Sequence, residues 1–303
     1  MRERPVALVV AGAVCIAFSA ILVRLADVTP STAAFYRCAY ALPPLAVLAL
    51  WERRRYGSRG WRPRLLAWAA GLFFAADLVL WHHSIAAVGA GLATVLGNVQ
   101  VVLVPLAAWL LLSERPGARV VAAVPVVLVG VVLISGVVGE GAYGDDPALG
   151  VLFGVLTAVA YAGFLLVLRA GSADARGSAG TLFHATLAAA IAVVPTGWLL
   201  GELELRTSWE AFAWLVVLAL TSQVLGWLLI TVALPLVPAA VSSVVLTLQP
   251  MLSVVFAMIL LDEDPSAVQL AGIVVVIAGI LLATVGRRSS GTEPAEPVGA
   301  VSS

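Results

Sequence analysis

Residues 111–116 read LLSERP and residues 260–265 read LLDEDP, and each hexamer ends a long apolar run. A shift of 149 residues aligns 90–135 with 239–284 without a gap, and fifteen of the 46 positions are identical. Apolar composition inflates such a count, so matches between polar residues, glycines and prolines carry more weight. These matches are Gln100 with Gln249, Glu114 with Glu263, Pro116 with Pro265 and Gly130 with Gly279. Because all four share one offset, the sequence predicts an internal duplication.

The chain is too apolar for a soluble domain. Of its 303 residues, 62% are hydrophobic and 11% are charged, and the mean hydropathy is +1.06. A soluble domain of this length needs more polar residues to cover its surface, whereas an apolar run of about 20 residues spans a hydrocarbon core. Ten such runs occupy 6–25, 30–51, 65–87, 90–112, 118–137, 148–168, 178–200, 211–233, 239–261 and 266–286. We expect an all-α integral membrane protein with ten transmembrane helices and no soluble catalytic domain.

The charges predict how these helices are inserted. All seventeen basic residues are arginine, and fourteen of them lie at the two termini or in alternate connections between the runs. The opposite connections hold ten acids, with only Arg206 and the helix-end Arg24 as bases. Under the positive-inside rule, both termini and the arginine-rich connections lie in the cytoplasm. The expected location is the cytoplasmic membrane of a bacterial-type cell, with multiple passes.

Five helices in each copy is an odd number, so the second copy must enter the membrane in the opposite sense. Inverted repeats of this kind build many secondary transporters, in which the substrate site lies near the middle of the membrane where the two halves meet. Alternating access then follows from rocking of the halves about that site. The duplication therefore favours transport more strongly than any single residue does.

Three segments carry a resemblance to a known family. They are STAAFYR at 31–37, GAGLATVLGNVQVVLVPLAAWLLLSERP at 89–116 and VPAAVSSVVLTLQPMLSVVFAMILLDEDP at 237–265. With two five-helix repeats and a Glu-x-Pro element after helices 4 and 9, the chain resembles the EamA-type carriers of the drug/metabolite transporter superfamily. These motifs identify the fold well and the substrate poorly.

The resemblance covers about residues 6–286 and implies further features. It implies two EamA-like repeats, at 6–137 and 148–286, followed by a disordered cytoplasmic tail at 287–303. In such carriers helices 3, 4, 8 and 9 line a central cavity, helices 1, 2, 6 and 7 flank it, and helices 5 and 10 lie at the periphery. Members move amino acids, nucleobases, drugs and other small metabolites, frequently outward.

Asp77 lies about halfway along the third run, where an ionisable group is costly and usually faces a cavity or a partner. It is either a proton-coupling acid or amine counter-ion, or a neutral carboxyl that holds helices together. Trp81 shares its helix face at i+4. His82 and His83 follow, and a proton-relay role competes with a simpler one as polar groups near the interface. No spacing of cysteines, histidines or acids predicts a metal site or a cofactor.

The other candidate binding residues are polar or aromatic groups within the runs. They are Tyr36, Arg37, Thr94, Asn98, Tyr161, Gln223, Trp227, Ser243 and Thr247. Arg37 suits a substrate carboxylate or a protein acid, or extends towards the outer surface. Thr94 and Asn98 lie on one face of the fourth run, and Ser243 and Thr247 repeat that face in the ninth, where they contact substrate or allow close helix packing.

The duplicated Glu-x-Pro elements call for a structural explanation. The predicted topology separates Glu114 and Glu263 by the thickness of the membrane, so they cannot act on one substrate together. Each precedes a proline, Pro116 or Pro265, that suits the first turn of a helix, where acids favour the positive end of the dipole. We expect these four residues to cap the fifth and tenth helices.

These observations favour a secondary active transporter that moves a small organic metabolite or drug, an amino-acid-like, aromatic or amine solute, with export as the expected direction. An importer or facilitator is the alternative within transport. A membrane-embedded lipid-modifying enzyme needs a nucleophile with its base, paired acids or a metal cluster, and no such pattern occurs. A chain without lysine also has no P-loop. The expected partners are the substrate, the lipid bilayer and a coupling proton, with no nucleic acid, and a homodimer stays open.

Overall fold

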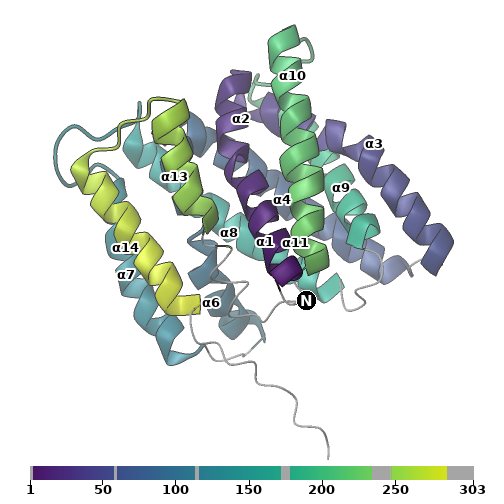
Figure 1. Cartoon of the computed structure of the whole chain (residues 1–303), viewed down its shortest axis with the longest axis horizontal. Coiled ribbons are helices and arrows are strands. Elements are labelled where there is room, and N and C mark those ends of the chain that lie inside the picture. The colour runs from purple at the N-terminus through teal and green to yellow at the C-terminus, as the bar shows by residue number, and fades with distance from the viewer. Residues whose placement is uncertain are drawn as a thin grey trace, which may run out of the picture.

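The computed structural model is built entirely of helices over the residues it describes, which are 3–57, 60–112, 116–171, 178–233, 246 and 248–284 (Figure 1). The helices are α1 (Glu3–Ala17), α2 (Ser19–Ala26), α3 (Pro30–Tyr56), α4 (Trp61–Val88), α5 (Ala90–Gly97), α6 (Gln100–Leu112), α7 (Ala118–Ile134), α8 (Pro147–Gly171), α9 (Ser178–Leu199), α10 (Trp209–Leu218), the π-helix η1 (Ala219–Gly226), α11 (Trp227–Ala233), α13 (Leu248–Leu260) and α14 (Ala267–Thr284).

Among these residues, seven helical stretches are long and apolar enough to cross a membrane. They are Val6–Ala26, Pro30–Tyr56, Trp61–Val88, Ala90–Ala107, Pro147–Val167, Ala179–Leu199 and Trp209–Ile230. Three shorter apolar helices occupy Ala118–Ile134, Leu248–Leu260 and Ala267–Ala283. Every apolar run predicted from the sequence therefore contains a helix, although the first part of the ninth run, like the tail after residue 284, lies outside the described residues. The chain is a multi-pass membrane protein.

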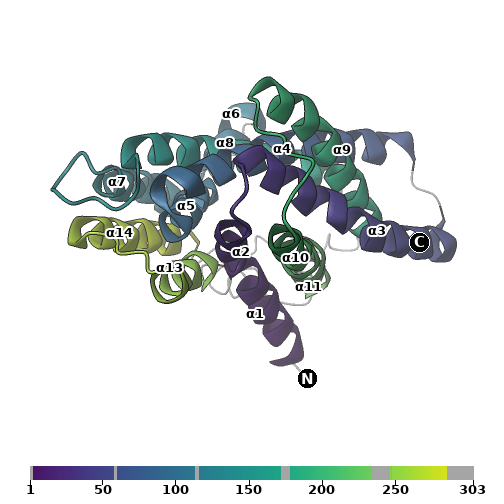
Figure 2. The same cartoon turned by 90° about the horizontal axis from the view of Figure 1, so that it is seen from above.

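The helices pack in the pattern that an internal two-fold axis requires. Viewed from above, α7, α8, α4 and α9 lie on one side of the molecule and α14, α13, α1 and α10 on the other (Figure 2). Two helices pack against their own counterpart from the other repeat: α3 on α9 and α7 on α14. The fourth and ninth runs also meet, because α5 packs on α13, which is the equivalent of α6. The third helix of each copy packs on the first helix of the other copy. α4 packs on α8, and α10, η1 and α11 pack on α1 and α2.

Contacts of two equivalent glycines repeat this symmetry at the level of single residues. A Cβ atom added to Gly130 in α7 would lie 2.6 Å from Cγ2 of Val276, and one added to Gly279 in α14 would lie 2.5 Å from Cγ2 of Val127. The 149-residue offset carries Gly130 to Gly279 and Val127 to Val276, so this is one contact made twice. Small residues permit such close approach of helix backbones within a membrane.

The second copy runs in the opposite sense to the first. α8, the first helix of the second repeat, begins beside the end of α4, where the Asp146 backbone N–H donates to the Ala87 carbonyl (3.2 Å). The loop before α8 also lies beside Arg24, near the end of α2. The first helices of the two copies, α1 and α8, therefore start at opposite ends of the bundle.

The α7–α14 contact gives the first prediction. Gly130→Ala places a methyl group 2.8 Å from the Gly272 carbonyl oxygen and 2.8 Å from the Val276 backbone nitrogen, and backbone atoms cannot move aside as a flexible side chain can. The substitution should cost about 1–3 kcal/mol and lower the melting temperature of the detergent-solubilised protein.

The matched control is Gly97→Ala, whose new methyl group would lie an ordinary 3.5 Å from the Thr157 side chain. This variant should melt at or above the wild-type temperature. Equal melting temperatures for the two variants would contradict the close α7–α14 packing.

Candidate functional site

Arg37 lies at the centre of a polar cluster within the bundle. It projects from α3 with only 4% of its surface exposed. Its Nε donates to Oε1 of Gln223 in η1 (3.1 Å), and its Nη1 donates to Oγ of Ser19 in α2 (2.9 Å). Among the residues that the structure describes, these contacts use two of the five N–H donors of a guanidinium. A buried cation thus joins three helices.

A π-helix shapes the side of the cluster that carries Gln223. In η1, Nε2 of Gln223 donates to Oγ1 of Thr186 in α9 (3.4 Å), and Oγ of Ser222 donates to the Cys15 carbonyl (2.9 Å). The side chains of Ser222 and Gln223 are fully buried. π-helical turns are rare and occur frequently at functional sites, because they redirect the side chains that they carry.

Asp77 supplies a negative charge close to this cluster. It lies in α4, is 8% exposed, and interacts electrostatically with both Arg37 and Tyr161. Asp77 and Arg37 do not form a direct ion pair in the part of the chain that the structure describes. The two buried charges are near each other but not in direct contact. Each can therefore bind an oppositely charged group of a ligand.

Aromatic rings lie beside these charges. The Arg37 guanidinium lies 5.6 Å from the centre of the Trp81 ring, within the range of a cation–π interaction. Tyr161 in α8 packs edge-on against Trp227 at the start of α11, with ring centres 6.5 Å apart. Phe164 contacts both of these rings. The predicted residues Arg37, Asp77, Trp81, Tyr161, Gln223 and Trp227 are therefore brought together.

The two adjacent histidines occupy different environments. His82 is 1% exposed, its Nδ1 contacts the Leu78 carbonyl, and its Nε2 has no hydrogen-bond partner among the described residues. The ring packs against Trp81, which places it next to the cluster. His83 instead faces the loop after α9, where its Nε2 lies 2.9 Å from Oε1 of Glu202.

Several predicted residues lie away from the cluster. Oγ1 of Thr94 donates to the Ala90 carbonyl (2.8 Å) and accepts from Oγ of Ser253 in α13 (3.0 Å). Nδ2 of Asn98 donates back to the Thr94 carbonyl (2.8 Å), so these groups serve the α5 backbone and the α5–α13 contact. The Tyr36 hydroxyl donates to the Leu205 carbonyl (2.8 Å). Ser243 and Thr247 lie outside the described residues.

Two residues of the cluster, Ser19 and Thr186, were not predicted. Hydroxyl side chains are common in apolar helices, where they often bond to their own backbone, so their presence alone carries little information. The 149-residue offset does place Thr186 at the position equivalent to Arg37, and this is the one sequence signal that could have identified it.

Glu263 caps a different helix from the one expected. Its carboxylate accepts hydrogen bonds from the backbone N–H groups of Ala90 (2.6 Å) and Gly91 (3.1 Å), at the start of α5 in the other repeat. Glu263 is 3% exposed, and burial raises its pKa, although the two N–H donors and the charge of Arg24 act in the opposite direction. It is therefore the N-terminal cap of α5, not of α14.

The expected proline positions also need correction. Oγ of Ser266 accepts from the Gln269 backbone N–H (3.3 Å) at the start of α14, and Pro265 precedes that serine outside the helix. Pro116 likewise lies before Gly117, the residue that precedes α7. Neither proline occupies the first turn, and Glu114 lies outside the described residues.

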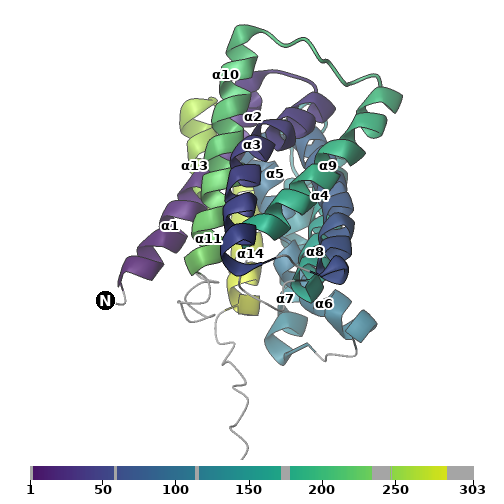
Figure 3. The ribbon, with the colours of Figure 1, turned by 90° about the vertical axis from the view of Figure 1, so that its right-hand side faces the viewer.

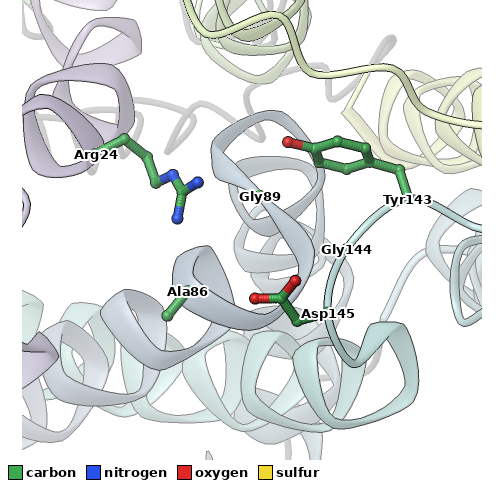
Figure 4. Close-up of a pocket in the computed structure, with 6 residues that line it drawn as sticks. All are labelled: Arg24, Ala86, Gly89, Tyr143, Gly144 and Asp145. Atoms are coloured by element: carbon green, nitrogen blue, oxygen red, sulfur yellow. The ribbon is translucent and has the colours of Figure 1, made fainter.

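A small pocket lies next to the α5 cap. Its volume is about 180 Å³, and Arg24, Tyr143 and Asp145 contribute polar groups to its wall (Figure 4). Ala86, Gly89 and Gly144 complete its lining. Gly89 has φ +89°, a conformation that favours glycine, and a Cβ atom there would lie 2.8 Å from the Glu263 carboxylate.

Comparison with known proteins decides the family. The sequence pattern of the EamA-like transporter family matches residues 4–136 and, a second time, 148–285. The chain belongs to the EamA-like transporter family. This EamA-like transporter matches no curated protein. Among solved structures, it is similar to one described as a crystal structure of a protein, at 16% identity, with a TM-score of 0.60 and coverage of 94% of this chain and 97% of that chain. At this identity the likeness concerns the fold alone.

The Glu263 cap generates the second prediction. Glu263→Ala leaves the N–H groups of Ala90 and Gly91 buried without an acceptor, at a cost on the order of 1–3 kcal/mol for each. Thermal unfolding in detergent should show a clear loss of stability. Asp264→Ala, which removes an exposed neighbouring carboxylate, is the control and should leave the unfolding temperature nearly unchanged. A similar shift for both variants would contradict the capping role.

Proposed function

We propose that this EamA-like transporter is a secondary active transporter that moves a small organic solute across the cytoplasmic membrane by alternating access, with export as its direction. The cluster around Arg37 is the observation that carries the proposal. It joins α2 and α3 of the first repeat to α9 and η1 of the second, so relative motion of the repeats would reshape it. The proposed architecture is ten transmembrane helices in two inverted five-helix repeats, 6–137 and 148–286, with both termini cytoplasmic.

The cluster favours a solute with separated charges and a flat apolar part. Arg37 suits a carboxylate, because a guanidinium binds carboxylates through paired N–H groups. Asp77 suits an ammonium group. Trp81, Tyr161 and Trp227 offer ring faces and edges to an aromatic or apolar side chain. An amino-acid-like or aromatic amine solute meets all three conditions.

Asp77 is also the residue that we propose for proton coupling. An acid within a membrane-spanning helix, next to a fixed cation, can exchange a proton for the cationic group of a substrate. His82, with its unpartnered Nε2 beside Trp81, is a second group of the same site that could hold a proton or a polar substrate atom. The described contacts of Thr94, Asn98 and Tyr36 give these residues a supporting part in the helix packing.

Transport by purified protein in liposomes tests the proposal. Proteoliposomes are loaded with a panel of amino acids, aromatic amines and nucleobases, and uptake and efflux are measured with and without a pH gradient. Arg37→Gln removes the charge and should slow transport of a carboxylate-bearing solute by about 10- to 100-fold, the equivalent of one charged hydrogen bond of about 1.5–3 kcal/mol. Arg62→Gln, at an exposed arginine near the start of α4 and outside the cluster, is the matched control and should transport at the wild-type rate.

Asp77→Asn separates coupling from binding. It should abolish accumulation driven by a pH gradient, because the amide cannot release a proton, while leaving in place the exchange of solutes that lack an ammonium group. Gel filtration of each variant verifies folding. Unchanged coupling in Asp77→Asn would remove Asp77 from the proton pathway, and failure of every solute to cross wild-type proteoliposomes would count against transport itself.

A further inference from the structure

The ends of the α3–α9 pair are held by two glutamates from opposite repeats. These antiparallel helices are the second helices of the two copies, and they pack directly on each other (Figure 3). Each carries a glutamate at or just after its C-terminal end, and each glutamate contacts the N-terminal end of the other helix. We call the contact at the end of the bundle that holds the start of α9 the Glu52 clamp, and the contact at the start of α3 the Glu202 clamp.

The Glu52 clamp consists of a carboxylate and backbone donors. Oε1 of Glu52 accepts from the Ala179 N–H (3.1 Å), and Oε2 accepts from the Gly180 N–H (2.9 Å). These groups lie in the first turn of α9, where backbone N–H groups have no partner within the helix and the helix dipole favours a negative charge. The carboxylate therefore binds both donors at once and ties the first repeat to the second.

The Glu202 clamp makes the equivalent connection at the other end of the pair. Oε2 of Glu202 accepts from Oγ of Ser31 (2.7 Å), and its backbone carbonyl accepts from the hydroxyls of Thr32 (2.8 Å) and Thr29. The Thr32 hydroxyl in turn accepts from the backbone N–H of Glu204 (2.8 Å). The loop after α9 is thus bound to the first turn of α3.

The two clamps are related by the internal duplication. The 149-residue offset carries Ser31 to Gly180, and it carries Glu52 to position 201, next to Glu202. Each contact therefore joins the same two places of the repeat, once at each membrane face. Ser31 and Glu52 both lie in α3, so their clamps are separated by about 30 Å along the helix, at about 1.5 Å for each residue.

We propose that Glu52 and Glu202 are gate residues of the transport cycle: opening to one side breaks the clamp on that side while the clamp on the other side holds. This proposal rests on alternating access as the mode of transport. The pseudo-two-fold axis relates α3 to α9, and it therefore exchanges the two ends of this pair. In the state open to one face, one clamp would be broken and the other formed. In the state open to the opposite face, the reverse would hold. Both clamps are formed in the structure, so this pair is closed at both faces.

The clamps differ in one chemical respect, because an imidazole takes part in the Glu202 clamp. His83 lies with its Nδ1 2.7 Å from the Val79 carbonyl and its Nε2 2.9 Å from Oε1 of Glu202. In the part of the chain that the structure describes, the Glu52 carboxylate is instead bound by two backbone N–H groups.

Reversible cross-linking tests the gate role. In a background of Cys15→Ser and Cys38→Ala, the pair Ser31→Cys with Glu202→Cys places thiols at one clamp, and Glu52→Cys with Gly180→Cys places them at the other. A short bifunctional methanethiosulfonate joins each pair and dithiothreitol releases it. Cross-linking either clamp should slow transport in proteoliposomes at least ten-fold, and reduction should restore the rate of the untreated double variant.

Single-cysteine variants treated with the same reagent are the matched controls, because they carry each substitution and modification but cannot be joined. Their rates should not fall on treatment. A structural brace that does not move during transport tolerates cross-linking, so full transport with both clamps joined would overturn the proposal. Absence of transport by wild-type protein would instead count against the proposed function, so the two failures are distinguishable.

Discussion

This fold depends on hydrogen-bond acceptors for the backbone N–H groups at the starts of its helices. The first backbone N–H groups of a helix have no partner within the helix, and within or near a membrane such groups are costly to leave unsatisfied. Glu52 and Glu263 supply their carboxylates to the starts of α9 and α5, and Glu202 binds the first turn of α3. Every one of these contacts crosses from one repeat to the other. The hydrogen bonds that satisfy these helix starts therefore also hold the two repeats together.

Some residues of the cluster differ in charge from their equivalents in the other repeat, and these differences are informative. The 149-residue offset relates Arg37 to Thr186, and Gln223 bonds to both, accepting from the first and donating to the second. The offset carries Asp77 to Gly226, within the π-helix. The two buried charges of the cluster thus lie in the first repeat, and the equivalent places in the second are neutral. The scaffold is symmetric, whereas the charge of the cluster is not.

Sequence patterns predicted the features that depend on local composition or on the duplication. These are the helical class, the apolar helices of the described residues and the duplication. The candidate binding residues stay a prediction. Some of them, Arg37, Asp77, Trp81, Tyr161, Gln223 and Trp227, lie in one cluster, whereas Tyr36, Thr94 and Asn98 lie elsewhere. The role of Glu263 was not predictable from neighbours in the chain, because its partner, Ala90, is 173 residues away. Proximity in sequence pointed to the next helix, whereas the actual partner follows from the packing of α5 on α13.

Irregular helix geometry explains why the polar cluster forms where it does. Ser19 begins α2 directly after the break at Phe18, and Gln223 lies within the π-turns of η1. Both bond to Arg37, so two of its helix contacts come from places where the regular α-helical repeat is interrupted. A regular α-helix consumes its own backbone hydrogen bonds and presents side chains at fixed angles, whereas an interruption redirects them. Interrupted helices at the repeat interface mark the substrate sites of inverted-repeat transporters. In this chain, the interruptions and the buried charges coincide at one place, Arg37.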